Sequence, residues 1–224
     1  MIIAKYLRSQ NKTDKDIRNT LDRYMKLSFK DYNSVLWANT LDKVVRTSKK
    51  RKLINIDKID LTESELNTVS QIDSKPCQRL LFTMLCFAKF FNIVNPNNNG
   101  WVNYNLKKIY SIARVQCNCR RHGEYERFLI QSGFLSESNK IDNVNLKVTF
   151  INDNSKVVLS VSDFRELGYE WELYNGSNQI IHCVDCDRLI KKNKYNNQTK
   201  RCKECQHKHL QQLWRESKRR QRMS

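Results

Sequence analysis

Proline and glycine are scarce in this sequence, with two prolines and five glycines among 224 residues. Flexible linkers and low-complexity segments are built from such residues, so few of them are expected. Long apolar runs are missing too. The most apolar stretch, residues 80–94, contains Lys89 and is shorter than the roughly 20 residues that span a bilayer. The start of the chain is too briefly apolar for a signal peptide, which favours a soluble, cytoplasmic protein without membrane contact.

Acidic residues are also few. The sequence has 23 Asp and Glu and 41 Lys and Arg, which gives a net charge of +18. Such an excess indicates a polyanionic partner, either nucleic acid or an acidic membrane surface. Residues 178–224 hold thirteen Lys and Arg against four Asp and Glu, which is half of the excess. The sequence shows no carboxylate cluster with a histidine, no nucleophile elbow and no phosphate-binding loop, so we expect a protein that is not an enzyme.

Four of the eight cysteines form two Cys-x-x-Cys pairs, Cys183 with Cys186 and Cys202 with Cys205. Each pair can turn both sulfurs to one side of a tight knuckle, and the spacing between the pairs is typical of zinc sites. Zinc prefers four ligands in a tetrahedron. A disulfide pair or a thioredoxin-like redox motif fits the lysine-rich loop and the missing βαβ context less well. The pattern predicts one structural Zn²⁺ ion held by these four thiolates.

Other potential ligands are interpreted as incidental or as outer groups. Three histidines flank the cysteine pairs: His182, His207 and His209. The four thiolates satisfy zinc without them. Cys117, Cys119 and His122 lie close together in the sequence, but no fourth ligand is evident there.

Residues 1–73 predict an N-terminal helical arm. Thr13-Asp14-Lys15-Asp16 is typical of a helix start, and a second helix is expected from about Asp31 to the basic run at residues 49–52. That run is either a solvated helix end, which we favour, or a phosphate-contacting patch. Thr62 and Glu65 match a capping box that opens a further short helix.

Residues 74–152 predict a compact domain around a buried helix. The helix at residues 77–92 is apolar nearly all round. A short strand, a helix at residues 106–115, a helix at residues 119–131 and two strands at residues 134–151 follow. This order resembles the winged helix-turn-helix domains of phage and plasmid regulators and replication proteins.

The resemblance makes the helix at residues 119–131 a recognition helix. Its basic residues are Arg120, Arg121 and Arg127, and the hairpin turn with Lys140 would be the wing. Arginine suits contact with guanine edges and phosphates. Glu124 and Glu126 oppose this interpretation because they repel phosphates. A winged helix that binds a protein is the alternative, and DNA contact is favoured.

Residues 153–180 predict a β connector with a strand at residues 156–161, a short helix at residues 162–168 and a strand at residues 169–174. Asn175-Gly176 is expected to form a hairpin turn that leads into the first knuckle. Residues 181–224 then form a zinc ribbon and a helix with Leu210, Leu213 and Trp214 along one edge. The basic residues of this helix that are expected to contact phosphates are Arg215, Lys218, Arg219, Arg220 and Arg222. A solvated tail is the alternative to this phosphate-tracking role.

The segments HCVDCDRLI and RCKEC, followed by a basic helix, resemble the C-terminal zinc ribbons of small proteins in phages and mobile elements of low-GC Gram-positive bacteria. The resemblance implies a location in the bacterial host cytoplasm. The fold class expected overall is α+β and mainly α. The expected function is binding of nucleic acid, namely double-stranded DNA, in transcription regulation or replication initiation. The alternative is a non-enzymatic adaptor that binds a host protein for host takeover or counter-defence.

Overall fold

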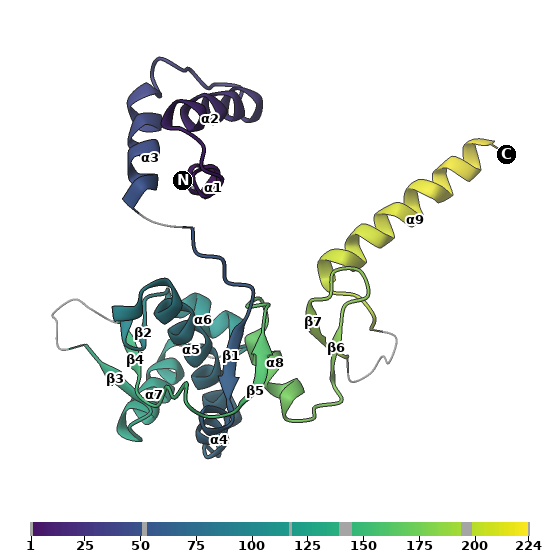
Figure 1. The fold of residues 1–224 in the computed structure, drawn as a ribbon. Helices are drawn as coiled ribbons and strands as arrows, with labels where there is room; N and C mark the ends of the chain where they lie inside the picture. Colours follow the sequence, from purple (N-terminus) through teal and green to yellow (C-terminus); the bar gives the residue numbers. More distant parts are fainter. Residues whose placement is uncertain (1, 51–52, 117, 139–144, 194–198, 224) are drawn as a thin grey trace. The chain divides into compact units, whose positions relative to one another are not determined.

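The computed structural model describes residues 2–50, 53–116, 118–138, 145–193 and 199–223, without the side chains of Cys119, Arg222 and Met223. The chain divides into two compact units, Met1–Asn55 and Ile56–Ser224. Both are rich in helix, and the sheets are small and antiparallel (Figure 1). The predicted α+β class with a helical majority is confirmed.

The first unit consists of three helices: α1 (Ile2–Ser9), α2 (Asp14–Ser28) and α3 (Ala38–Lys50). The predicted start of α2 is confirmed, because Thr13 and Asp16 form a capping box. The sequence did not predict α1, and α3 starts at Ala38 rather than near Asp31. Asn33 explains the late start, since its side chain accepts the amide N–H groups of residues 35 and 36 and holds a turn there. The core of this unit is formed by Ala4, Ile17, Leu21, Leu41 and Val45.

The second unit is built around one long helix. The long helix is α5 (Lys75–Val94). The elements before it are β1 (Ile59–Thr62) and α4 (Glu63–Ser70), and those that follow it as far as the end of the three-stranded sheet are η1 (Pro96–Asn98), β2 (Trp101–Val102), α6 (Leu106–Ile112), α7 (Cys119–Gln131), β3 (Leu135–Glu137) and β4 (Leu146–Val148). The remaining elements are β5 (Val157–Val161), α8 (Leu167–Tyr174), β6 (Ile180–His182), β7 (Leu189–Lys191) and α9 (Lys203–Met223).

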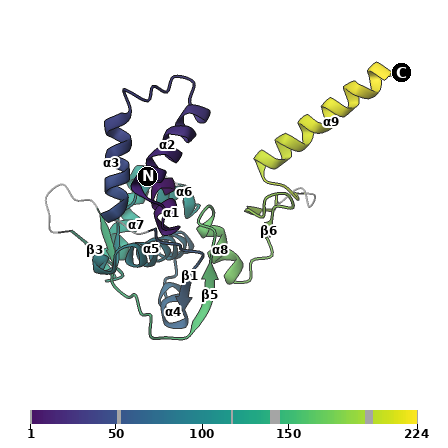
Figure 2. The ribbon, with the colours of Figure 1, turned by 45° about the horizontal axis from the view of Figure 1, so that its top comes forward.

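Helix α5 is the centre of the core of this unit (Figure 2). Among the described residues it alone is long and apolar enough to span a bilayer, but most of it is buried within the protein. A helix that packs against its own chain on nearly all sides is a core helix. The burial of α5 fits the predicted soluble protein.

Helices α6 and α7 and a three-stranded sheet pack against α5. The strands pair in the order β2-β4-β3, and both pairs are antiparallel. The bounds of α7 agree with those predicted from the sequence. Gly133, at φ +77°, ends α7 as predicted, because its amide donates to the carbonyl of Ile130 and the next amide to that of Leu129.

The two units meet in the chain at residue 55, earlier than the predicted arm boundary at residue 73. Strand β1 pairs antiparallel with β5, with Ile59 opposite Val161. Helix α4, which follows β1 directly, packs against α5, and its Leu66 is fully buried in the same core. Residues 56–73 therefore belong to the second unit.

A buried carboxylate ties α4, α5 and the segment after β4 together. Glu65 is 0% exposed, and the ammonium of Lys89 on α5 lies 2.9 Å from both of its carboxylate oxygens. The backbone amides of Thr62 and Asn152 donate to the same two oxygens at 2.8 and 3.0 Å. Lys89 also reaches Asp153 at 2.7 Å. The predicted capping box is thus present, and its glutamate also serves as a tertiary contact.

The connector has the predicted first strand, which is β5, but differs from the predicted β structure after it. Residues 169–174, predicted as a strand, belong to helix α8, and Gly176 ends that helix rather than forming a hairpin turn. The Gly176 amide donates to the Leu173 carbonyl and the Ser177 amide to the Glu172 carbonyl, which is a helix-ending pattern. The predicted helix at residues 162–168 is wrong except for its last two residues.

We predict that Glu65→Ala destabilises the second unit by about 3–5 kcal/mol, because it leaves the Lys89 ammonium buried without its main partner. Urea denaturation followed by far-UV circular dichroism and tryptophan fluorescence measures the change. The matched control is Glu63→Ala, an exposed glutamate in the same helical turn, which should change the free energy of unfolding by less than about 0.5 kcal/mol. Equal effects of the two substitutions would contradict the role given to Glu65.

Candidate metal centre

The first cysteine pair lies in the loop of a β-hairpin. Strands β6 and β7 pair antiparallel, with His182 opposite Leu189, and Cys183 and Cys186 fall in the loop between them. The amide of Asp187, a residue at φ +58°, donates to the carbonyl of Cys183 and closes a tight turn. The hairpin predicted across Asn175-Gly176 is wrong, because residues 167–174 form α8. A different hairpin, β6–β7, encloses the first knuckle.

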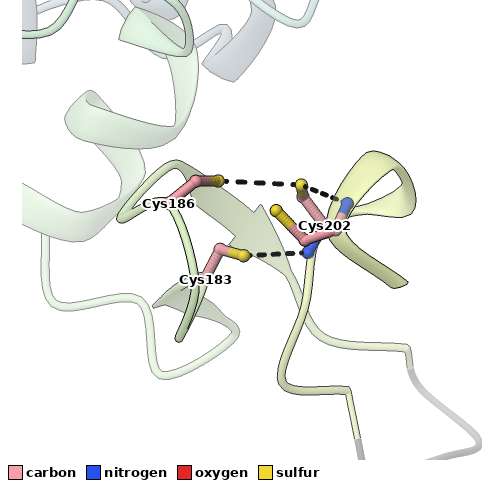
Figure 3. A group of neighbouring side chains, drawn as sticks. Cys183, Cys186 and Cys202 are labelled. Carbon is pink, nitrogen blue, oxygen red and sulfur yellow. Dashed lines mark hydrogen bonds between the residues drawn. The ribbon is translucent and has the colours of Figure 1, made fainter. Parts of the chain in front are cut away.

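The second pair lies at the start of α9 and faces the first. The amide of Val184 donates to the carbonyl of Lys200 at 3.1 Å and joins the two knuckles through their backbones. Cys202 precedes the first helical residue of α9, and Cys205 lies one turn on. Figure 3 shows Cys183 and Cys186 on one side and Cys202 on the other, with their sulfurs directed into the space between them.

The four sulfurs are close enough to bind one metal ion. All four lie within 4.8 Å of one another, and the sulfurs of Cys186 and Cys202 are 3.8 Å apart. Four sulfurs at about 2.3 Å from a central ion in a tetrahedron are about 3.8 Å apart. Cys183 and Cys202 are buried, while the other two cysteines are partly exposed. The predicted ligand set is thus brought together.

Backbone amides point at the sulfurs, as expected where thiolates are to be stabilised. The Cys202 amide lies 3.2 Å from the Cys183 sulfur, and the Cys205 amide lies 3.4 Å from the Cys202 sulfur. Burial acts to raise the pKa of Cys183, but amide hydrogen bonds, first that of Cys202, outweigh it and lower the pKa to about 6. Hydrogen bonds with the thiols of Cys202 and Cys186 raise the pKa of Cys205 to about 12. The two pKa shifts are thus opposite in direction. A bound divalent cation would favour the thiolate forms of both Cys183 and Cys205.

Two ion pairs cross from one knuckle to the other. Arg201 donates to Asp185 at 2.8 Å, and Arg188 donates to Glu204 at 3.2 Å. Each acidic partner is one of the residues between two cysteines. Sequence reasoning missed these pairs, and only the alternation of acidic and basic residues around the cysteines could have suggested them. Both pairs therefore join the first knuckle to the second.

The hairpin is also tied to α8 and to the end of α6. The carboxylate of Glu166, which is buried, accepts two hydrogen bonds from the guanidinium of Arg114, and Arg188 approaches the same carboxylate at 3.7 Å. The hydrogen bonds of this pair raise the pKa of Arg114. Arg165 donates to the carbonyl of Cys186 at 3.3 Å. Charged contacts thus link the first knuckle to the helical part of its unit.

No protein-family model, curated protein or solved structure matches this chain. The functional interpretation therefore rests on the residues of the chain itself.

The predicted nucleic-acid contacts fall on two helices. On α7, Arg120, Arg121 and Arg127 are exposed. On α9, the predicted contacts Arg215, Lys218, Arg219 and Arg220 are exposed, and the Lys218 ammonium lies 3.8 Å from the centre of the Trp214 ring. Lys140, Cys117 and the side chains of Cys119 and Arg222 lie outside the described residues. The wing contact and the interpretation of Cys117 and Cys119 as incidental therefore stay predictions.

We predict that elemental analysis finds one metal ion per chain and that Cys183→Ser combined with Cys202→Ser removes it, because each knuckle then keeps a single thiolate. The control is Cys77→Ala, since this cysteine is buried in the helical core away from the cluster. Stoichiometric metal in the double variant would exclude these residues as the ligands.

Proposed function

We propose that this chain is a non-enzymatic nucleic-acid-binding protein whose partner is double-stranded DNA. The observation that carries the proposal is the exposed basic helix α9 at the four-cysteine cluster, in a chain of net charge +18. The role we propose is transcription regulation or replication initiation.

Helix α7 is the proposed contact with base edges. The order α5, β2, α6, α7, β3 and β4, with sheet order β2-β4-β3, fits the predicted winged helix-turn-helix arrangement. In such a domain the N-terminal part of the second helix of the helix-turn-helix motif, which is α7 here, faces the major groove. Arg120 lies there with a side chain that is 89% exposed. A long, exposed arginine at this position suits bidentate contact with guanine.

The two glutamates on α7 oppose DNA contact less than the sequence suggests. Glu126 turns toward the protein and accepts a hydrogen bond from the Tyr110 hydroxyl at 2.7 Å. Glu124 remains exposed but lies 3.4 Å from Arg120. The exposed part of α7 therefore has three arginines and one glutamate, which favours an anionic partner.

Helix α9 is the proposed contact with the phosphate backbone. Its residues beyond Cys205 are nearly all exposed, and Lys208, Arg215 and Arg219 lie along the side opposite Leu210 and Trp214. Phosphate contacts position a protein on DNA without reading sequence. In this proposal α7 provides sequence specificity through base contacts, and α9 provides affinity through phosphate contacts.

The metal that we propose is a single Zn²⁺ ion with a structural role. Four thiolates complete its coordination and leave no position for a catalytic water. Bound there, the ion would hold the start of α9 against the β6–β7 hairpin.

We predict that affinity for duplex DNA falls steeply with salt and that replacing Arg219 and Arg220 by Gln reduces the slope of log K against log salt by about 0.9 for each phosphate that the variant no longer neutralises. Fluorescence anisotropy with a labelled duplex measures the slope. Arg23→Gln, an exposed arginine of the first unit, is the control and should leave the slope unchanged. Affinity that is insensitive to salt would contradict the proposal.

We predict a different result for α7, because base contacts discriminate between sequences by about 1–3 kcal/mol each. Arg120→Ala should broaden the sequences recovered by binding-site selection from random duplexes, whereas Arg219→Gln should lower affinity equally for all of them. If one stoichiometric protein is instead captured after nuclease treatment and duplexes are not bound, the adaptor alternative holds.

A further inference from the structure

The first unit exposes large apolar side chains in one short stretch, residues 27–37. Leu27, Val35 and Leu36 are 82%, 81% and 79% exposed, and Phe29 and Trp37 are also exposed. All five lie where α2 ends and α3 begins, and this connection spans the ends of the two helices (Figures 1 and 2). Exposed apolar side chains that are scattered singly need no explanation, whereas a group of large ones in one short stretch indicates an interaction site.

The stretch is held in place by specific hydrogen bonds. The Asn33 side chain accepts the amides of Val35 at 2.9 Å and Leu36 at 3.3 Å. The Tyr32 hydroxyl donates to Asp22 at 2.6 Å, and its ring packs 6.3 Å from that of Trp37. The turn is thereby preorganised with its apolar side chains outward, which lowers the entropy lost on binding.

The charges of the stretch are balanced, unlike those of the chain as a whole. Residues 27–37 contain one basic and one acidic side chain, Lys30 and Asp31, which are neighbours. The next charged residues on either side are already paired, Lys26 with Asp22 and Asp42 with Arg18. The net charge of this stretch is zero, so it offers little electrostatic attraction to a polyanion or a strongly acidic protein. A surface with one charge of each sign is complementary to a copy of itself.

We propose that residues 27–37 form the interface of a homodimer. The two copies meet across a two-fold axis, with the apolar side chains at the centre and Lys30 of each copy beside Asp31 of the other. Five large side chains with this exposure present on the order of 500 Å², close to the roughly 600 Å² that each partner contributes to a small stable interface. This inference concerns assembly and does not depend on nucleic-acid binding.

Sedimentation equilibrium of the full, nuclease-treated chain at moderate salt tests the proposal. We expect a reversible dimer, and Val35→Ser combined with Leu36→Ser should raise its dissociation constant more than about tenfold. Val157→Ser combined with Val158→Ser changes two exposed valines of the second unit and should leave the constant unchanged. Circular dichroism of each variant checks that the fold is kept.

A charge exchange tests the orientation of the two copies. Asp31→Lys alone should weaken the dimer, because it places like charges together, whereas Lys30→Glu combined with Asp31→Lys should restore it. A chain that sediments as a monomer at every concentration overturns the proposal. A dimer that survives the Val35 and Leu36 changes, or one that the charge exchange does not restore, also overturns it. If the unmodified chain forms the dimer but does not bind duplex DNA, only the proposed function is contradicted.

Discussion

The second unit depends on a carboxylate that has no contact with water. Glu65 receives the Lys89 ammonium and two backbone amides, so three separate parts of the chain converge on one side chain. Burying such a charge is costly unless its hydrogen-bonding capacity is met, and here four hydrogen bonds meet it. Because Lys89 is on α5, the pair fixes where α4 and the end of the sheet sit on the central helix. Helices α6 and α7 pack on that same helix.

A second buried carboxylate plays a similar part near the cysteines. Glu166 binds Arg114, which follows α6, and also approaches Arg188 in the β6–β7 loop. Arg114 adopts φ +55°, a conformation costly for a residue other than glycine, and its pairing with Glu166 compensates for that cost. Close backbone packing supports the contact, because a Cβ on Gly168 would lie 2.0 Å from the Ala113 carbonyl oxygen. Helix α8 can therefore lie against the end of α6 only with glycine at this position.

Local signals in the sequence predicted the parts of the fold that local chemistry decides. The limits of α7, the helix start at Thr13, the capping box at Thr62, the stop at Gly133 and the two cysteine pairs all follow from residues close together in the chain. Helix α8 was misread because Tyr169, Trp171 and Leu173 alternate as in a strand. The pairing of β1 with β5 joins residues about one hundred positions apart. The cross-knuckle pairs join Asp185 to Arg201 and Arg188 to Glu204, and no short-range pattern predicts such contacts.

The position of the cysteines explains how a metal could control the basic helix. Cooperative helix formation requires a costly first turn, and a solvent-exposed helix gains little stability from packing. In α9 that first turn contains Cys205 and follows Cys202, whose sulfur accepts the Cys205 amide. A metal bound to both sulfurs would fix this turn and set the direction in which the helix leaves the hairpin. The basic side chains further along α9 would then keep a fixed direction relative to the hairpin only while all four cysteines bind the metal. The proposed metal is in this way coupled to the proposed contact with DNA.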